Sequence, residues 1–281
     1  MRLLITGGSS LVARRVGQLL AATHEILYAG RRDADFPLEL GQAQISFPSH
    51  ARFDAVIHCA ADFGGDKEED VLRAEMVNAV GAFHVARIAQ GAQARHIILI
   101  STSFAANGPE DDYYNAYSLS KRHGEELSAF FCRHVGLPLT ILRPVQVYGD
   151  QMEFAKHQPL FYHMIRQAAR GEDILLFGNR DPERAFLHVD DLAAVIREVL
   201  NKKILGLHTV AEGQSYRLTE IAALAYEAFG TKGRVSFDPA RPDIAQVKPG
   251  THSPTLAAAG ILPLIHLSEG LRRLRKLEVC R

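Results

Sequence analysis

The chain lacks the long apolar runs of a membrane protein, since none approaches the roughly 20 residues that a membrane helix needs. It has no excess charge of one sign: 32 Lys and Arg offset 32 Asp and Glu, so no nucleic-acid partner is indicated. Its 3 cysteines and 13 histidines are scattered and show no metal or redox spacing. Met1 and Arg2 lead into an apolar strand rather than a signal peptide, so we expect a cytoplasmic protein without metal.

The chain does have short apolar runs that alternate with helical patterns. The runs at 3–5, 25–29, 54–58, 97–100 and 139–142 alternate with helical periodicity at 11–22, 71–90 and 115–135, whereas 33–53 is weakly patterned. Such alternation predicts an α/β fold with parallel strands and crossover helices. We expect a doubly wound, Rossmann-type domain (1–150, with 185–210 returning to it) and a smaller mixed α/β substrate lobe (151–184 and 211–281).

The pair Tyr117 and Lys121 is the strongest chemical signal in the chain. Residues four apart on a helix lie on one face, one turn apart. An ammonium beside a phenol lowers its pKa from about 10, and a tyrosine tuned in this way exchanges protons at neutral pH. An isolated pair of this spacing is ordinarily a surface feature of an amphipathic helix, so its interpretation depends on the surrounding sequence.

Two neighbouring features give the pair its context. The hydroxyl cluster Ser101-Thr102-Ser103 follows an apolar run, and a glycine turn, Thr6-Gly7-Gly8, joins the first strand to a helix. The order of glycine turn, hydroxyls and Tyr-x-x-x-Lys resembles the extended branch of the short-chain dehydrogenase/reductase superfamily, which modifies nucleotide sugars. The resemblance extends from Leu3 to about Leu271.

The resemblance implies a dinucleotide site at the carboxyl ends of the first strands. A tight turn and helix amides are needed to hold pyrophosphate. Ser10 and Ala13 replace the second and third glycines of the family motif; Ser10 could weaken binding or supply a hydroxyl donor. A small-residue strip would give the riboses room, and a helix asparagine would brace the site. The predicted cofactor residues are Gly7, Ser9, Ser10, Leu11, Cys59, Ala60, Ala61, Asn78, Tyr117 and Lys121.

The second strand predicts the cofactor type. It ends in Gly30, followed by Arg31 and Arg32, where NAD-preferring relatives have an aspartate. An acidic residue there binds the ribose 2′-hydroxyl, whereas arginine accommodates a 2′-phosphate. A basic surface turn is the alternative interpretation. We therefore expect Arg31 and Arg32 to favour NADPH over NAD.

The family motifs also imply catalytic and substrate residues. Ser103 would hold the substrate oxygen, with Tyr117 as proton donor and Lys121 supporting it; Phe104 and Ala105 stand where sugar dehydratases carry acids, which disfavours dehydration. Gln146 would contact the sugar, and Arg184 and Arg241 would bind the diphosphate, although either could be a surface arginine. His188, Asp190 and Asp191 would be structural, with one aspartate capping the next helix.

Together these features predict an NADPH-dependent oxidoreductase that acts on a keto or hydroxyl carbon of a nucleotide-activated sugar, similar to the 4-ketoreductases. A 4-epimerase that retains NAD is the first alternative, and Arg31 argues against it. A non-catalytic dinucleotide sensor is the second, since fold does not dictate function. The resemblance further implies a homodimer that pairs the helices over 71–90 and 115–135.

Overall fold

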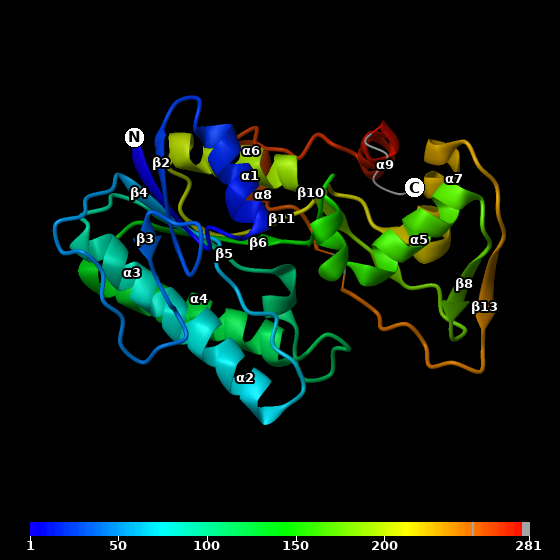
Figure 1. Ribbon diagram of the computed structural model, residues 1–281, viewed down its shortest axis with the longest axis horizontal. Helices are drawn as coiled ribbons and strands as arrows, with labels where there is room; N and C mark the ends of the chain where they lie inside the picture. The colour runs from blue at the N-terminus through cyan, green and yellow to red at the C-terminus, as the bar shows by residue number, and fades with distance from the viewer. Residues whose placement is uncertain (249, 277–281) are drawn as a thin grey trace.

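The computed structural model describes residues 1–248 and 250–276 (Figure 1). Within this part of the chain, seven parallel strands form one sheet in the order β3-β2-β1-β4-β5-β6-β11. The predicted Rossmann-type doubly wound sheet is confirmed. The strands are β1 (Arg2–Thr6), β2 (Glu25–Gly30), β3 (Phe36–Pro37), β4 (Ala55–His58), β5 (Ile97–Ile100), β6 (Leu139–Pro144) and β11 (Gly206–Val210).

Helices cover both faces of this sheet (Figure 1). On one face lie α1 (Leu11–Leu20), α6 (Val189–Lys202) and α8 (Pro254–Ala258); on the other lie α2 (Glu68–Ala74), α3 (Gly81–Gly91) and α4 (Ala116–Val135). A π-helical segment, Glu75–Val80, joins α2 to α3, so the helices expected over 71–90 and 115–135 are present. The weakly patterned 33–53 holds only the short strand β3.

The alternation of side chains along each strand divides the core between the two faces. Leu3 and Ile5 of β1 pack in a cluster with α1 and α6, whereas Leu4 packs in a second cluster with α3. β4 and β5 are buried at every position, as parallel strands covered on both faces require. This explains why these strands read as unbroken apolar runs in the sequence.

The second lobe lies beside the carboxyl end of the sheet (Figure 1). It contains α5 (Pro159–Arg170), α7 (Leu218–Phe229), α9 (Leu267–Lys276) and two strand pairs: β8 (Ile174–Phe177) with β13 (Val235–Asp238), and β9 (Glu183–Arg184) with β12 (Tyr216–Arg217). A third pair, β7 (Gln146–Tyr148) with β10 (Phe186–His188), connects it to the sheet.

The predicted division into domain and lobe stays a prediction. Leu256 and Ile261 pack in the cluster between the large sheet and the helices α1 and α6, although both fall in the predicted lobe segment 211–281. Residues 249 and 277–281 of that segment lie outside the described part of the chain. Among the helices of the described residues, none is both long and apolar enough to cross a bilayer.

Candidate active site

A cavity of about 1050 Å³ opens where the sheet meets the second lobe. Its walls come from the loops that follow β1, β2, β4 and β5, from the start of α4, and from β7, α5 and α7. Ligands bind at this edge of open parallel sheets, because the loops there diverge and leave a crevice. The cavity is therefore where the predicted site residues should meet.

Tyr117 and Lys121 lie together in the cavity wall. Asn115 and Ser118 form a capping box that fixes the first turn of α4, which carries Tyr117. Lys121 lies one turn later, is 3% exposed, and its Nζ donates to the carbonyl of Ile100 at 2.7 Å. The end of β5 and the first two turns of α4 are thus joined at the centre of the site.

The titration of this pair differs from the sequence-based prediction. Burial raises the pKa of Tyr117 to about 12, and its hydrogen bond with Thr102 offsets only part of that rise. Burial lowers the pKa of Lys121 to about 8, against the opposing effect of Glu125. The prediction of a Tyr117 pKa below its ordinary value of about 10 is wrong for this structure, because the effect of burial dominates. Tyr117 is a protonated phenol at neutral pH, as a proton donor must be.

The hydroxyl beside Tyr117 belongs to Thr102. Thr102 lines the cavity, bonds to the Tyr117 side chain and caps the 3₁₀ turn η2 (Ser103–Ala106) by accepting from the amide of Phe104. Ser103, to which the sequence motif assigned the catalytic hydroxyl, does not line the cavity; the Cβ of Ser103 lies near Gly250. The structure therefore brings together Thr102, Tyr117 and Lys121, and not Ser103.

The turn after β1 has the shape that a dinucleotide requires. Gly7 has φ +78°, and a Cβ there would lie 2.8 Å from the backbone of Ala60, so the turn admits only glycine. Ser10 precedes α1 without a capping bond from its side chain, so its hydroxyl and the first amides of α1 are available to an anion. The predicted residues that line the cavity here are Gly7, Ser9, Ser10, Leu11, Cys59, Ala60 and Ala61. These residues fit a pyrophosphate-linked cofactor.

The far end of this half of the cavity carries charges of both signs. Arg31 lines it with its side chain 74% exposed, and its Nε lies 4.0 Å from Oε2 of Glu39, which also lines it. Arg32 is exposed and does not line the cavity. Only one of the two predicted arginines is therefore in place, and an unpredicted carboxylate lies beside it.

Asn78 lies behind the cavity wall and does not line it. Its amide accepts from the N–H of Asp62 at 2.8 Å and donates to the Asp62 carbonyl and to the hydroxyl of Ser120. It thereby ties the loop after β4 to α4. The structure therefore shows the predicted bracing contact of Asn78. The side chain itself does not line the cofactor half of the cavity.

On the substrate side, Gln146 and Arg184 line the cavity. The amide of Gln146 donates to Gln158 at 2.8 Å, and its own Oε1 is buried with no partner among the described residues. Arg184 is 3% exposed and donates to the carbonyls of Glu183 and Ala245, and its guanidinium faces the ring of Tyr113. Besides burial, the only side chain that affects the pKa of Arg184 within the described part of the chain is Tyr113, which bonds to it, and no carboxylate does, so Arg184 is a buried cation without a carboxylate counterion.

Arg241 lies elsewhere. Its side chain is 62% exposed, pairs with Asp238 at 3.8 Å, faces the ring of Phe177 and does not line the cavity. The predicted convergence of Arg184 and Arg241 on one diphosphate is absent from this structure. Their sequence motifs gave no indication of this difference, because it depends on how β13 and the loop after it pack.

Among the cavity residues that sequence reasoning missed are Phe63, His157 and Gln158. The Phe63 ring stacks on Tyr117 with centroids 5.0 Å apart and on His157 at 4.3 Å. The available signal was a large apolar residue that is separated from the small-residue strip by Asp62 and is followed by Gly64 and Gly65. His157 and Gln158 carry no comparable signal, because the fold of the second lobe brings them here.

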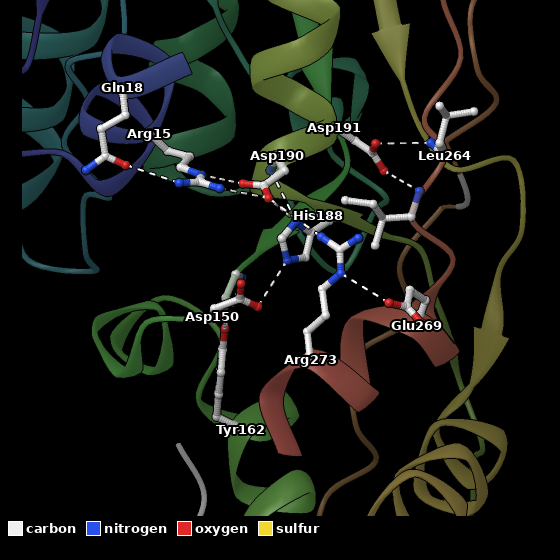
Figure 2. A network of polar contacts seen from close by, with 12 residues as sticks. Arg15, Gln18, Asp150, Tyr162, His188, Asp190, Asp191, Leu264, Glu269 and Arg273 are labelled. Carbon is white, nitrogen blue, oxygen red and sulfur yellow. Dashed lines mark hydrogen bonds and ion pairs between the residues drawn. The ribbon is translucent and has the colours of Figure 1, made fainter. Parts of the chain in front are cut away.

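A polar network outside the cavity connects α1 to the second lobe (Figure 2). Arg15 of α1 makes two hydrogen bonds to Asp190, and Arg273 of α9 pairs with the same carboxylate. His188 is buried; it contacts Asp150 at 3.2 Å and accepts from the amide of Asp190. The expectation that an aspartate caps α6 is wrong, since the imidazole of His188 is the cap and Asp191 accepts from the amides of residues 264 and 265.

The fold and the cavity define a Rossmann-type dinucleotide enzyme. The family model described as "NAD dependent epimerase/dehydratase family" matches residues 3–210, and the chain belongs to this family. Proteins similar to this chain include NAD(P)-dependent epimerases and reductases.

Two curated relatives illustrate the range of reactions. The chain is 23% identical to UDP-glucuronic acid decarboxylase 1 of Xenopus tropicalis over 97% of its length and 70% of the relative's. It is 27% identical to dTDP-4-dehydro-6-deoxy-D-allose reductase of a Streptomyces species, over 67% of its length and 63% of the relative's. Identity at this level leaves the individual reaction open.

Two solved structures share the fold over nearly the whole chain. RMD of Pseudomonas aeruginosa, complexed with NADPH, superposes with a TM-score of 0.79 at 22% identity and covers 98% of both chains. UDP-glucose 4-epimerase of Thermus thermophilus, complexed with NAD, gives 0.78 at 20% identity, with 99% of this chain and 98% of the other covered. The fold therefore accommodates both cofactors.

Proposed function

We propose that this protein is an NADPH-dependent oxidoreductase that reduces a keto carbon of a nucleotide-activated sugar. The observation that carries the proposal is a single cavity in which a hydroxyl, a protonated phenol and a buried lysine lie next to a pyrophosphate-shaped turn. These are the groups that a carbonyl reduction uses, one to hold the oxygen and one to protonate it.

The cofactor, when bound, would supply the hydride; the remaining work falls to the chain. The Thr102 hydroxyl, which bonds to the Tyr117 side chain in this structure, would redirect its one proton to the substrate oxygen and hold that oxygen beside the phenol. Tyr117 would then release its proton to that oxygen as negative charge develops there. Lys121, anchored on the Ile100 carbonyl, would stabilise the resulting phenolate with its positive charge.

The proposed substrate carries a diphosphate that binds Arg184. A buried guanidinium without a counterion is unfavourable, and burial lowers the pKa of Arg184. An anionic ligand in the cavity would relieve this cost through charge-assisted hydrogen bonds from the remaining N–H groups. Gln146, whose buried Oε1 has no partner among the described residues, would accept a hydrogen bond from a sugar hydroxyl.

The 4-epimerase alternative stays open, because oxidation and re-reduction of one carbon use the same three side chains. Glu39 beside Arg31 favours this alternative, since a carboxylate there can bind the 2′-hydroxyl of the unphosphorylated ribose of NAD. Net consumption of NADPH with a nucleotide keto-sugar separates the reactions, because an epimerase consumes no cofactor. A non-catalytic sensor would bind the dinucleotide and turn over nothing.

Arg184→Ala tests the substrate proposal, and Arg241→Ala is its matched control. Loss of a charge-assisted bond worth ~1.5–3 kcal/mol should raise the KM for the nucleotide sugar by about 10- to 100-fold in Arg184→Ala and leave NADPH affinity unchanged. Arg241→Ala should differ little from the parent, because its side chain lies outside the cavity. Equal KM values for the parent and Arg184→Ala would exclude a diphosphate bound at this arginine.

We further propose a homodimer built on the helices of the α2–α4 face. Leu127 and Phe130 of α4 are 42% and 66% exposed, and Val71 and Leu72 of α2 are exposed as well. Apolar side chains gathered on neighbouring helices are typical of a subunit interface. The cytoplasmic location expected from the sequence stays a prediction.

A further inference from the structure

Phe63 is an exposed aromatic residue whose ring lies against the proposed proton donor Tyr117. It is 54% exposed, yet its ring is stacked between Tyr117 on α4 and His157 at the end of the 3₁₀ turn η3 (Met152–Lys156), with interplanar angles of 25° to each. An exposed phenylalanine costs the fold hydrophobic stabilisation. Its position against the proton donor therefore points to a role toward the ligand.

The loop that carries Phe63 is fixed on both sides of the residue. Asn78 binds both backbone groups of Asp62, and the Asp62 carboxylate accepts from the Gly64 amide and from Arg73. Gly64 has φ +69°, and a Cβ there would come within 3.2 Å of the Cβ of Ala116. Phe63 is thus a rigid part of the wall beside Tyr117.

The neighbouring surface has the opposite character. Gln158, next to His157 in the chain, accepts from the amide of Gln146 and leaves Oε1 of Gln146 buried and unpaired within the described residues. Near Tyr117 the cavity therefore presents an aromatic ring from one lobe and an amide pair that spans both lobes. A sugar bound there would contact the apolar ring of Phe63 on one side and the hydrogen-bonding amides of Gln146 and Gln158 on the other. The ring favours apolar substituents of the sugar, and the amides favour hydroxyl groups.

We propose that Phe63 is a specificity-determining residue: it accepts a methyl group on the carbon next to the reacting carbon and disfavours a hydroxymethyl group there. A hydroxyl packed against the ring would lose its hydrogen bonds to water without replacement, whereas one at the amide pair would keep them. His157, whose pKa is lowered by burial, acts as a neutral ring that holds Phe63 in place. This inference rests on the proposed nucleotide-sugar function.

The test compares nucleotide sugars that differ only in the 6-hydroxyl: UDP-galactose with UDP-D-fucose, and GDP-mannose with GDP-D-rhamnose. Their Kd values are measured by calorimetry with the cofactor-saturated full chain. The parent should bind the deoxy member of the pair about 10- to 100-fold more tightly, the range that an apolar pocket achieves. Phe63→Leu should keep this ratio, Phe63→Ser should bring it near one, and His157→Ala should reduce it.

The controls separate this inference from the proposed function. NADPH affinity and the thermal unfolding midpoint should be unchanged in Phe63→Leu and Phe63→Ser. A change in the ratio of the two sugar Kd values then results from the altered contact with the sugar and not from a loss of folded protein. A ratio near one in the parent, or an unchanged ratio in Phe63→Ser, would overturn the role of Phe63 while the nucleotide-sugar function stands. If NADPH binds and neither pair of sugars does, the proposed function fails and this inference fails with it.

Discussion

Thr102 and Ser103 are adjacent in the chain, and the difference between them comes from the backbone at the end of β5. Thr102 has extended dihedral angles, φ −153° and ψ 151°, whereas Ser103 begins the 3₁₀ turn η2. Successive side chains of extended backbone point to opposite sides, so only one of two neighbours reaches a given ligand. A shift of one residue at this position therefore decides which hydroxyl meets the substrate oxygen.

Thr102→Val and Ser103→Ala form a matched pair. Thr102→Val is nearly isosteric and removes the hydroxyl bonded to Tyr117, so we expect kcat to fall about 100-fold, with NADPH affinity retained. Ser103→Ala should keep kcat within about threefold, because Ser103 does not line the cavity. Steady-state kinetics of both variants decide which hydroxyl is catalytic. A large loss of kcat in Ser103→Ala together with a small one in Thr102→Val would restore the assignment of Ser103 made from the motif.

Glu39 and Arg31 predict how strongly the protein prefers NADPH. The Glu39 carboxylate competes with a 2′-phosphate for Arg31 and repels it, so Glu39→Gln should tighten NADPH binding about two- to fivefold and leave NADH binding unchanged or weaker. Arg31→Gln should weaken NADPH binding selectively, and Arg32→Gln, at an exposed position off the cavity, is the control. Fluorescence titration of the parent and the three variants with NADPH and with NADH supplies these affinities. Equal Kd values of the parent for NADPH and NADH would contradict the role of Arg31.

At the scale of elements, α4 connects the site to the surface of the molecule. Its first two turns carry Tyr117 and Lys121, its buried Glu125 pairs with Arg143 of β6 at 2.5 Å, and its later turns expose Leu127 and Phe130. The ion pair is nearly enclosed, and breaking one partner of such a pair is costly. The same helix is therefore fixed on the sheet and available to a second subunit.

Phe130→Asp tests the proposed dimer. A charge placed on a 66% exposed residue leaves the monomer fold intact but would be buried in an interface, so the variant should be monomeric by light scattering at micromolar concentration where the parent is dimeric. Leu262→Asp, at a residue 53% exposed outside these helices, should leave the dimer unchanged. A monomeric parent at that concentration would rule out this interface.

At the scale of the whole molecule, local pattern predicted the sheet and the cofactor half of the site. The Tyr117–Lys121 spacing, the Gly7 turn and the small residues Cys59 to Ala61 act through their own stretch of backbone, so their sequence was informative. The cavity residues His157, Gln158 and Glu39 depend on how distant segments pack, as does the exclusion of Arg241. The pKa of Tyr117 was mispredicted for the same reason, because its burial depends on the residues around it.

Carbonyl reduction by this protein can be measured as the rate of NADPH oxidation with a nucleoside diphosphate 4-keto-sugar, for the parent and for Tyr117→Phe. The parent should consume one NADPH for each hydroxyl formed. Tyr117→Phe should lose about 10²- to 10⁴-fold in kcat, with its NADPH affinity unchanged, since only the proton donor is removed. Turnover by Tyr117→Phe at the parent rate, or no consumption of NADPH by the parent with any nucleotide keto-sugar, would contradict the proposed reaction.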